Sequence, residues 1–449
     1  TLITILLIFF GCNNQQKDDI DAIGKEIVLR LEPTSDNPRN SEGDFIQLKD
    51  GHILFIYTKF TSGSGDHAKA HLASRISADK GKTWSKEDKV VVPNEGLMNV
   101  MSVSLLRLDD GRIALFYLRK NSTTECIPFM RVSNDEAKTW GDATRCIPST
   151  GYHVMNNDRV IQLKSGRIII PVALHGSTET SITANATIMC YYSDDLGETW
   201  QKSESIQNKN NTTLQEPGII ELKDGKIMLF CRTESGVQYF SYSNNECESW
   251  SPIEPGNIKS PLSPASIKRI PTTGDLLLVW NNNFKEGRDG GKRTPYNMAI
   301  SKDEGKTWIK TKTIESDPDG WYCYSAIDFV DDFVLLGHCA GNRKLYNGLE
   351  TTQITRLHLD WLYDDALPDP IIKSDNNGEV ELACDEKDVQ IRFTLDGSNP
   401  DETSVIYNNP FSVSRTTLLR MQAHKPGKPS SMIVSEYVGT DILQEAMEI

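Results

Sequence analysis

The sequence predicts an all-β protein in which a six-bladed β-propeller is followed by a small β-sandwich domain. The first observation is an eight-residue motif with five copies at spacings of roughly fifty to sixty residues, a period typical of propeller blades rather than helical arrays. The second is a series of hairpin patterns with almost no helical periodicity between them. The copies are "SADKGKTW" from Ser77, "SNDEAKTW" from Ser133, "SDDLGETW" from Ser193, "SNNECESW" from Ser243 and "SKDEGKTW" from Ser301.

Each copy follows two apolar runs that flank a tight turn, which is a strong short-range signal for a β-hairpin. Six hairpins predict six blades of about four strands each, arranged radially so that few sheet edges stay exposed. The first five hairpins are "FIQLKDGHILFIY", "LLRLDDGRIALFY", "VIQLKSGRIIIPV", "IIELKDGKIMLF" and "IKRIPTTGDLLLVW", and the sixth, "AIDFVDDFVLLGH", lacks the motif.

The motif itself makes sense as a folding device. Its Ser and Asp side chains can accept hydrogen bonds from turn amides, its Gly can take a positive φ, and its Trp can pack between adjacent blades. Ala137 and Cys247 stand where the other copies have Gly, so we expect these two turns to be strained or differently shaped. A calcium loop is disfavoured, because the alternating oxygen ligands and the distal Glu are missing.

The predicted boundaries follow changes in composition along the chain. Residues 25–365 form the propeller, the Pro- and Asp-rich stretch "DDALPDPIIKSDNNG" is a linker, residues 369–439 form the sandwich, and residues 440–449 are a tail. Residues 1–12 contain an apolar run of about ten residues, well short of the roughly 20 needed to span a bilayer. A polar tether follows at residues 13–24.

Composition excludes some classes of partner and cofactor. The chain of 449 residues has a formal net charge of -14, which argues against nucleic-acid binding. To bind an anionic substrate, the protein would need a local cluster of Arg whose positive potential outweighs the negative potential of the whole chain. The nine cysteines form no CxxC pair and no His lies at zinc spacing, so we expect no metal and no cofactor. Cys126 and Cys146 flank one repeat, and whether they pair stays open.

The N-terminal "TLITILLIFFGC" resembles a bacterial lipoprotein signal, in which Cys12 would be cleaved and acylated. A simple secretory signal is the alternative. The resemblance implies an exported lipoprotein, periplasmic or on the cell surface, attached to the outer membrane by its lipid.

The repeats resemble the Asp boxes of the sialidase (neuraminidase) superfamily, over residues from about 25 to 363. The C-terminal "VQIRFTLDGSNPDETSVIYNNPFSV" resembles the β-sandwich module of bacterial chitobiases. Asp boxes indicate a fold and not a chemistry, so the site has to be found elsewhere.

Sialidases hold the substrate carboxylate with three Arg side chains, which match carboxylate geometry better than Lys. The resemblance implies Arg232 in "LFCRTESG" and Arg293 in "GGKRTPYN" as two of them. The first Arg is less well matched, since the family's Phe/Tyr-Arg-Ile-Pro stretch is replaced by "NPRNSEGDF", in which Arg39 is the nearest equivalent.

The same resemblance implies the catalytic groups. Asp66, on the loop "SGSGDHAKA", matches the acid/base, a role that suits a carboxyl with a raised pKa. Glu216 in "LQEPGII" matches the residue that takes the phenolic proton, and Tyr324 in "WYCYSAIDF" matches the nucleophile. Tyr322 competes for that role, because it would share a face with Tyr324 on a regular strand.

Two segments depart from the family pattern. "SEGD" adds Glu42 and Asp44 near the expected mouth, and "MNNDRV" places Asn157, Asp158 and Arg159 where many members have a Gly-rich stretch. Since hub loops of a propeller commonly line its pocket, we expect Asp158 and Arg159 to bind substrate, with an internal ion pair as the alternative.

Three functions remain open. The first is a retaining exo-α-sialidase acting on terminal sialic acids of glycoconjugates. The second is a glycosidase for another sugar, such as a deaminated sialic acid or Kdo. The third is a carbohydrate-binding lipoprotein without turnover, which the Tyr and Glu pair disfavours.

Overall fold

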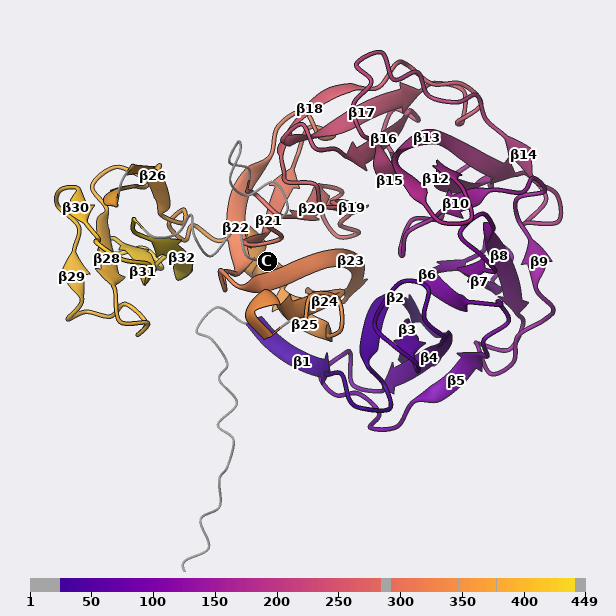
Figure 1. Ribbon diagram of the computed structural model, residues 1–449, viewed down its shortest axis with the longest axis horizontal. Coiled ribbons are helices and arrows are strands. Elements are labelled where there is room, and N and C mark those ends of the chain that lie inside the picture. The colour runs from indigo at the N-terminus through magenta and orange to yellow at the C-terminus, as the bar shows by residue number, and fades with distance from the viewer. Residues whose placement is uncertain (1–24, 284–291, 346, 377, 441–449) are drawn as a thin grey trace, which may run out of the picture.

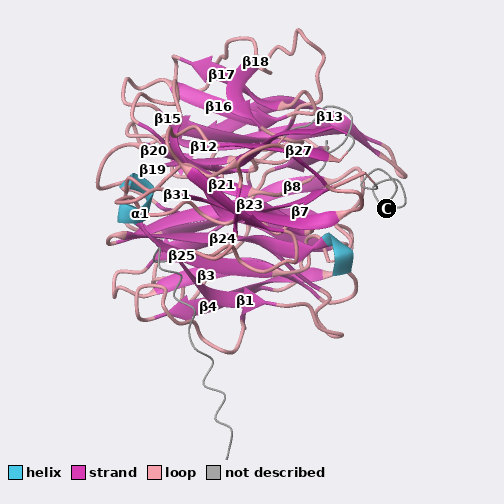
Figure 2. Ribbon diagram, turned by 90° about the vertical axis from the view of Figure 1, so that its left-hand side faces the viewer, coloured by secondary structure: helices cyan, strands magenta, loops and turns pink. Residues whose placement is uncertain are grey.

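The computed structural model describes residues 25–283, 292–345, 347–376 and 378–440. Six blades surround a central axis, and a smaller β-domain lies beside the ring next to β21 and β22 (Figure 1). The predicted fold class, an all-β propeller followed by a sandwich, is confirmed. Among the described residues helix is limited to α1, Leu359–Tyr363, and the 3-10 turn η1, Arg343–Leu345 (Figure 2).

The blades follow the predicted hairpins. Blade 1 contains β2 (Arg39–Gln47), β3 (Ile53–Phe60), β4 (Ala70–Ser77) and β5 (Lys89–Val92); blade 2 contains β6 (Asn99–Arg107), β7 (Ile113–Lys120), β8 (Cys126–Ser133) and β9 (Thr144–Arg145). Blade 3 contains β10 (Tyr152–Val154), β11 (Ile161–Gln162), β12 (Ile168–Ser177), β13 (Ile182–Ser193) and β14 (Gln201–Lys202). Blade 4 contains β15 (Gln215–Glu221), β16 (Ile227–Arg232), β17 (Val237–Ser243) and β18 (Glu254–Lys259). Blade 5 contains β19 (Ser266–Arg269), β20 (Leu276–Trp280), β21 (Tyr296–Ser301) and β22 (Ile309–Glu315).

Blade 6 is built from both ends of the propeller segment. Its inner strands are β23 (Gly320–Val330), β24 (Phe333–Asn342) and β25 (Thr352–His358), and its outer strand is β1 (Lys25–Leu31), which pairs antiparallel with β25. The hairpin pattern did not reveal this role of β1. Closing the ring in this way pairs the edge that β25 would otherwise expose.

The Asp-box turns have the expected hydrogen bonds. In the first box Gly81 N donates to Ser77 Oγ at 2.9 Å, and Thr83 N donates to Asp79 Oδ1 at 2.8 Å. In the two boxes without Gly, Ala137 and Cys247 take φ values of 61° and 73° and keep the same bond to their Ser. These turns therefore keep the common shape and carry backbone strain instead.

The box Trp side chains pack between blades, as expected. Trp84 of blade 1 packs against apolar residues shared with blade 6, and Trp200 of blade 3 meets the ring of Phe116 in blade 2 at 6.2 Å.

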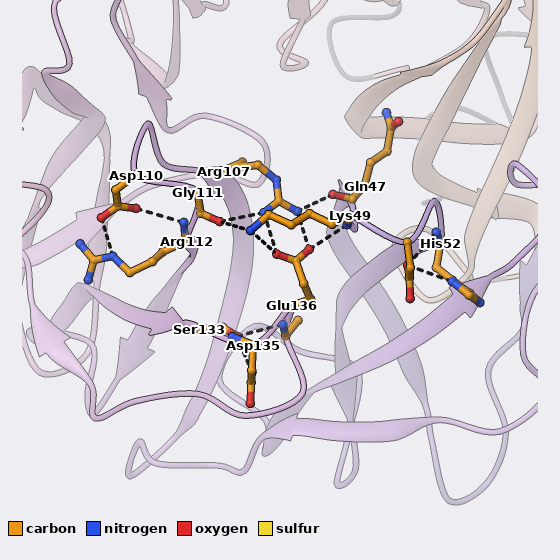
Figure 3. Close-up of polar contacts among 12 residues, drawn as sticks. Gln47, Lys49, His52, Arg107, Asp110, Gly111, Arg112, Ser133, Asp135 and Glu136 are labelled. Atoms are coloured by element: carbon orange, nitrogen blue, oxygen red, sulfur yellow. Dashed lines mark hydrogen bonds and ion pairs between the residues drawn. The ribbon is translucent and has the colours of Figure 1, made fainter.

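Neighbouring blades are also linked by a repeated polar contact. Glu136, in the blade 2 box, accepts hydrogen bonds from the Arg107 guanidinium at 2.8 and 3.0 Å and from the backbone N of Lys49 in the blade 1 hairpin at 2.9 Å (Figure 3). The bonds from Arg107 lower the pKa of Glu136 to about 2. Glu304 repeats the arrangement with Arg269 and Lys223 between blades 4 and 5.

The C-terminal domain contains β26 (Ile371–Asn376), β27 (Glu379–Ala383), β28 (Gln390–Thr394), β29 (Val405–Ile406), β30 (Phe411–Ser412), β31 (Thr417–His424) and β32 (Val434–Val438), in two small sheets. It contacts blades 5 and 6 through specific polar groups. Asp369 accepts from the backbone N of Thr313 in blade 5 at 2.9 Å and, within the C-terminal part, from that of Met432 at 3.0 Å. The Tyr437 hydroxyl donates to Asp319, next to blade 6, at 2.9 Å.

Two further expectations concern the cysteines and the membrane. Cys126 and Cys146 are buried free thiols in the structure, so they do not pair. Cys12, the proposed lipidation site, lies outside the described residues. Within the described residues, none of the helical segments has the length and apolar character needed to cross a bilayer.

Candidate active site

The innermost strands of four blades are bulged where they reach the hub. Their pairing shifts between Ser41 and Gly43 in β2, Met101 and Ser104 in β6, Gln215 and Gly218 in β15, and Cys323 and Ala326 in β23. The bulges contain Glu42, Ser102, Glu216 and Tyr324, which all line one hub cavity of about 210 Å³. A bulge re-aims a side chain, and here four of them direct polar groups into the same space.

Tyr324 and Glu216 form the central pair of this cavity. The Tyr324 hydroxyl donates to Glu216 Oε1 at 3.0 Å, and Arg232 Nη1 lies 2.9 Å from the other carboxylate oxygen. Both Tyr324 and Glu216 have positive φ values, 56° and 51°, which are strained for residues other than Gly. Burial, followed by the charge of Glu216, raises the pKa of Tyr324, so the phenol is neutral beside its acceptor.

Tyr322 points elsewhere. It stacks on Tyr296 with ring centroids 5.8 Å apart and lies 6.3 Å from His338, within the core of blades 5 and 6. The expectation that it shares a face with Tyr324 was wrong, because the bulge interrupts the regular alternation of β23.

Arg39 and Asp66 form a second pair. Arg39, 2% exposed, donates from Nη1 to Asp66 Oδ1 at 2.6 Å and to Ser64 O at 3.0 Å. The Asp66 loop is held by Lys120 Nζ and Asn99 Nδ2, which both donate to the Asp66 carbonyl at 2.9 Å.

The electrostatics of Asp66 differ from the expectation. Burial of the loop opposes ionisation, but the charges of Arg39 and Lys120 outweigh it and lower the pKa of Asp66. The Asp66 side chain is 58% exposed, so its burial is incomplete and the combined effect of the two cations prevails. The expectation of a raised pKa is therefore not met in the free protein.

Arg293 approaches the site from blade 5. Its Nη1 donates to the Cys323 sulfur at 2.9 Å, and its guanidinium lies 5.0 Å from the Trp321 ring centroid and 5.3 Å from that of Tyr324. Arg39 and Arg293 do not line the described hub cavity, but each contacts a residue that does. Arg232 lines it directly, and its Nε donates to Gln215 at 2.9 Å.

Asp158 and Arg159 are used in contacts between blades. Asp158 binds Lys268 at 2.8 Å and accepts from the backbone N of Ile327 at 2.9 Å, while Arg159 Nη2 donates to Ala265 O at 2.7 Å. Neither side chain lines the hub cavity, so their contacts do not support the expected role in substrate binding.

Two other residues of the unusual segments also act within the fold. Asn157 donates to the carbonyls of Gly43 and Tyr324, which helps hold the backbone of the proposed nucleophile. Asp44 is buried and accepts from the backbone N of Phe45 and Leu105, each at 2.7 Å.

Sequence reasoning missed several residues of the cavity wall, among them Lys120, Tyr152, Asn156 and His175. A signal existed for Lys120, which ends the second hairpin strand of blade 2 just as Arg232 does in blade 4. Three larger grooves contain none of the predicted catalytic residues: one of about 760 Å³ lies between blades 1 and 2, and two of about 340 and 850 Å³ lie beside the C-terminal domain. In the described ranges no three His, Cys, Asp or Glu residues gather as metal ligands.

Comparisons with known proteins agree with this fold. The family model of the BNR repeat-like domain matches residues 89–335, more than half of the chain, and the model of the chitobiase/beta-hexosaminidase C-terminal domain matches residues 373–435. A sialidase of Clostridium perfringens is 27% identical over 277 residues, which cover 55% of this chain and 70% of that protein. A sialidase of Bacteroides fragilis is 26% identical over 214 residues, 44% of this chain and 36% of the relative.

Solved structures resemble the chain in fold. The NanB sialidase of Streptococcus pneumoniae has a TM-score of 0.58 at 16% identity, with 75% of this chain and 71% of that chain covered. A protein of unknown function from Dyadobacter fermentans has a TM-score of 0.60 at 17% identity, covering 75% of this chain and 100% of its own. The chain belongs to the BNR repeat-like family of the sialidase superfamily and carries a C-terminal domain of the chitobiase type.

Proposed function

We propose that this protein, a sialidase-like glycoside hydrolase, is a retaining exo-α-sialidase that releases terminal sialic acids from glycoconjugates. The observation that carries the proposal is the contact of the Tyr324 hydroxyl with Glu216, which is itself paired with Arg232 at the hub cavity. A Tyr and Glu pair with arginines beside it suits a sugar that bears a carboxylate, because an anionic nucleophile would be repelled by that group.

The proposed first step uses the central pair. Tyr324 attacks the anomeric carbon while its proton passes to Glu216 over the 3.0 Å hydrogen bond. The glycosidic bond breaks, and Asp66 gives a proton to the leaving oxygen. In the second step Asp66 takes a proton from water, the resulting hydroxide attacks the same carbon, and the bond from that carbon to the Tyr324 oxygen breaks. The phenolate that leaves recovers its proton from Glu216. Two displacements give net retention.

Asp66 has to be protonated before the first step, although Arg39 keeps it ionised in the free protein. A substrate carboxylate that binds Arg39 would compete with Asp66 for the guanidinium. Loss of that partner raises the pKa of Asp66 and favours the acid form. Substrate binding would thus favour protonation of Asp66, the form that the first step requires.

The test is the release of a fluorogenic aglycone from α-sialosides by the full chain, with the anomer of the first product followed by NMR. We expect release, with the α anomer formed first. No release from any sialoside would contradict the proposal, and a first product of β configuration would exclude retention.

A related sugar acid is the second candidate, because the arginines would bind the carboxylate that deaminated sialic acid and Kdo share with sialic acid. The same assay with glycosides of these two sugars decides between this candidate and the sialidase. Sugar binding without turnover of any glycoside would favour the third function, a carbohydrate-binding protein.

The proposal includes export as a lipoprotein anchored through Cys12, on the resemblance of the N-terminal segment to a lipoprotein signal. In bacteria fed a labelled fatty acid, the chain should carry label that Cys12→Ser removes. Equal labelling of both chains would contradict the assignment.

A further inference from the structure

Glu42 is an acidic residue at the hub for which the proposed reaction has no use. It lies at the bulge of β2, lines the hub cavity, and is only 6% exposed. Its Oε1 is 3.8 Å from Arg39 Nη2, beyond hydrogen-bond distance, and its Oε2 is buried without a hydrogen-bond partner. A buried carboxylate oxygen without a donor is unfavourable, which calls for an explanation.

The surroundings of Glu42 disfavour its ionised form. Burial raises its pKa to about 7, Arg39 opposes this change, and the negative charges of Asp66 and Glu216 add to it. The titratable and charged groups around it come from blades 1, 2, 3, 4 and 6: Arg39, Asp66, Lys120, Cys126, Tyr152, His175, Glu216, Arg232, Tyr324 and Cys339.

We propose that Glu42 is a specificity-determining residue that binds the carboxylate of the substrate as a neutral acid. The inference rests on the proposed function, and it adds one hydrogen-bond donor to the arginines. A sugar carboxylate held by Arg39 Nη2 comes next to Glu42, which is 3.8 Å from the same nitrogen. Two carboxyl groups in such contact share one proton, since like charges at that distance do not both ionise.

The proton is taken from solvent when the substrate binds and is returned when the product leaves. An ionised Glu42 would instead add a third carboxylate to Asp66 and Glu216 and weaken the attraction of the site for an anion. Binding of an acidic sugar is therefore linked to proton uptake, and it weakens as the pH rises above the range in which Glu42 is protonated.

The experiment compares the full-length wild type with Glu42→Gln, which keeps the shape and a donor but cannot ionise. Glu87→Gln, at an exposed position after the first Asp box, is the matched control. Calorimetry with the 2,3-unsaturated analogue of sialic acid, at pH 8 in buffers of different ionisation enthalpy, measures proton uptake. We expect the wild type and the control to take up more protons than Glu42→Gln, and Glu42→Gln to bind about tenfold tighter than the wild type.

Turnover gives a second readout. For the wild type kcat/KM on a sialoside should fall about tenfold between pH 6 and pH 8, and this fall should be absent in Glu42→Gln. Thermal unfolding checks that Glu42→Gln folds. If Glu42→Gln does not fold, Glu42→Ala takes its place, because this substitution also removes the titrating group. If neither variant folds, the wild-type profile still decides, because a constant kcat/KM from pH 6 to pH 8 contradicts the proposal.

Two other results would overturn it. Equal proton uptake in wild type and Glu42→Gln would show that Glu42 does not titrate with the ligand. Weaker binding of the analogue by Glu42→Gln than by the wild type at every pH would show that binding requires the ionised form of Glu42. An ionised Glu42 would suit a sugar without a carboxylate. Failure of the proposed function looks different, since then neither the wild type nor any variant cleaves a sialoside, whether or not it binds the analogue.

Discussion

The perimeter and the hub of the propeller both use backbone at positive φ, but they hold it with different partners. At the perimeter each Asp box has two successive residues at positive φ, the second of which is Gly81, Gly197 or Gly305 in three boxes, and the hydrogen bonds of each turn close within eight residues. At the hub Glu216 and Tyr324 take positive φ values, and the hydrogen bond that joins these two residues spans 108 positions of the chain. The comparison teaches that the repeated element, whose bonds are local, stabilises the ring, whereas the unrepeated one, held by residues distant in sequence, presents the chemistry.

The energetic reason is the strain of left-handed backbone, on the order of 1–2 kcal/mol for a residue other than Gly. Such a conformation persists only where the surrounding structure enforces it. At the hub, Asn157 binds the carbonyl of Tyr324, and the arginines hold Glu216 and the Tyr324 ring in place.

The largest effect should come from Tyr324→Phe, which removes the nucleophilic oxygen and leaves the ring in place. We expect kcat on a fluorogenic sialoside to fall by about 10³ or more. Tyr322→Phe is the matched control and should stay within about threefold of wild type, because its ring packs in a blade core. Equal losses in both would remove the distinction between the two tyrosines.

Arg232→Lys tests the hub cation against one at the perimeter. Because Lys cannot hold a carboxylate in the bidentate manner of Arg, we expect kcat/KM to fall about 10²-fold. Arg167→Lys changes an Arg that pairs with Asp194 and Glu248 at the blade 3 perimeter, and should leave kcat/KM within about twofold. A comparable loss in Arg167→Lys would mean that the perimeter also controls catalysis.

The pH dependence of stability should differ in sign between the two regions. The folded-state pKa of Glu42 is raised to about 7 by burial, so its favourable contribution is complete below pH 4.5 and is lost as the pH rises through 7. Wild type should lose on the order of 2 kcal/mol of unfolding free energy relative to Glu42→Gln between pH 4.5 and pH 7.5. Urea denaturation of both proteins at these two pH values measures the difference. The same change in unfolding free energy with pH in wild type and Glu42→Gln would contradict the prediction.

Asp135, in the second box, should behave in the opposite way. Hydrogen bonds from Thr139 lower its pKa to about 2, so its contribution is complete above pH 3.8 and is lost as the pH falls toward 2. In the same denaturation experiment Asp135→Asn should therefore destabilise the protein at pH 7 and approach wild type at pH 2 to 3. An unchanged difference at both pH values would exclude a role for the ionised carboxylate.

The smallest effects should come from exchanging Gly and Ala in the box turns. Gly305→Ala should destabilise the protein by about 1 kcal/mol, because φ is 83° there and the new Cβ meets Met228 only at 3.5 Å. Ala137→Gly should stabilise it by about 0.5 kcal/mol, because it relieves a φ of 61°. Urea midpoints measure both, and sialoside turnover should not change. Two shifts of the same sign would contradict strain as the cause.

The sequence by itself determined the repeated architecture, because its signals are local. The residues of each box interact within one turn, as Ser77, Asp79 and Gly81 do, or with the next blade, and each hairpin has its turn between two apolar runs. The same signals place Arg232 at the end of a strand and Glu216 at the start of one. The chitobiase-type domain was recognisable for the same reason, since its strands and turns are contiguous in the chain.

Only the tertiary structure decided how these pieces meet. The pairing of β1 with β25 joins residues more than three hundred positions apart, and the bulge that separates Tyr324 from Tyr322 depends on the register of β24. Asp158 forms a contact between blades because blade 5 brings Lys268 beside it. The pKa of Asp66 is lowered because other strands bring Arg39 and Lys120 beside it. Charge, burial and strand register arise from neighbours distant in sequence, so no local pattern contains them.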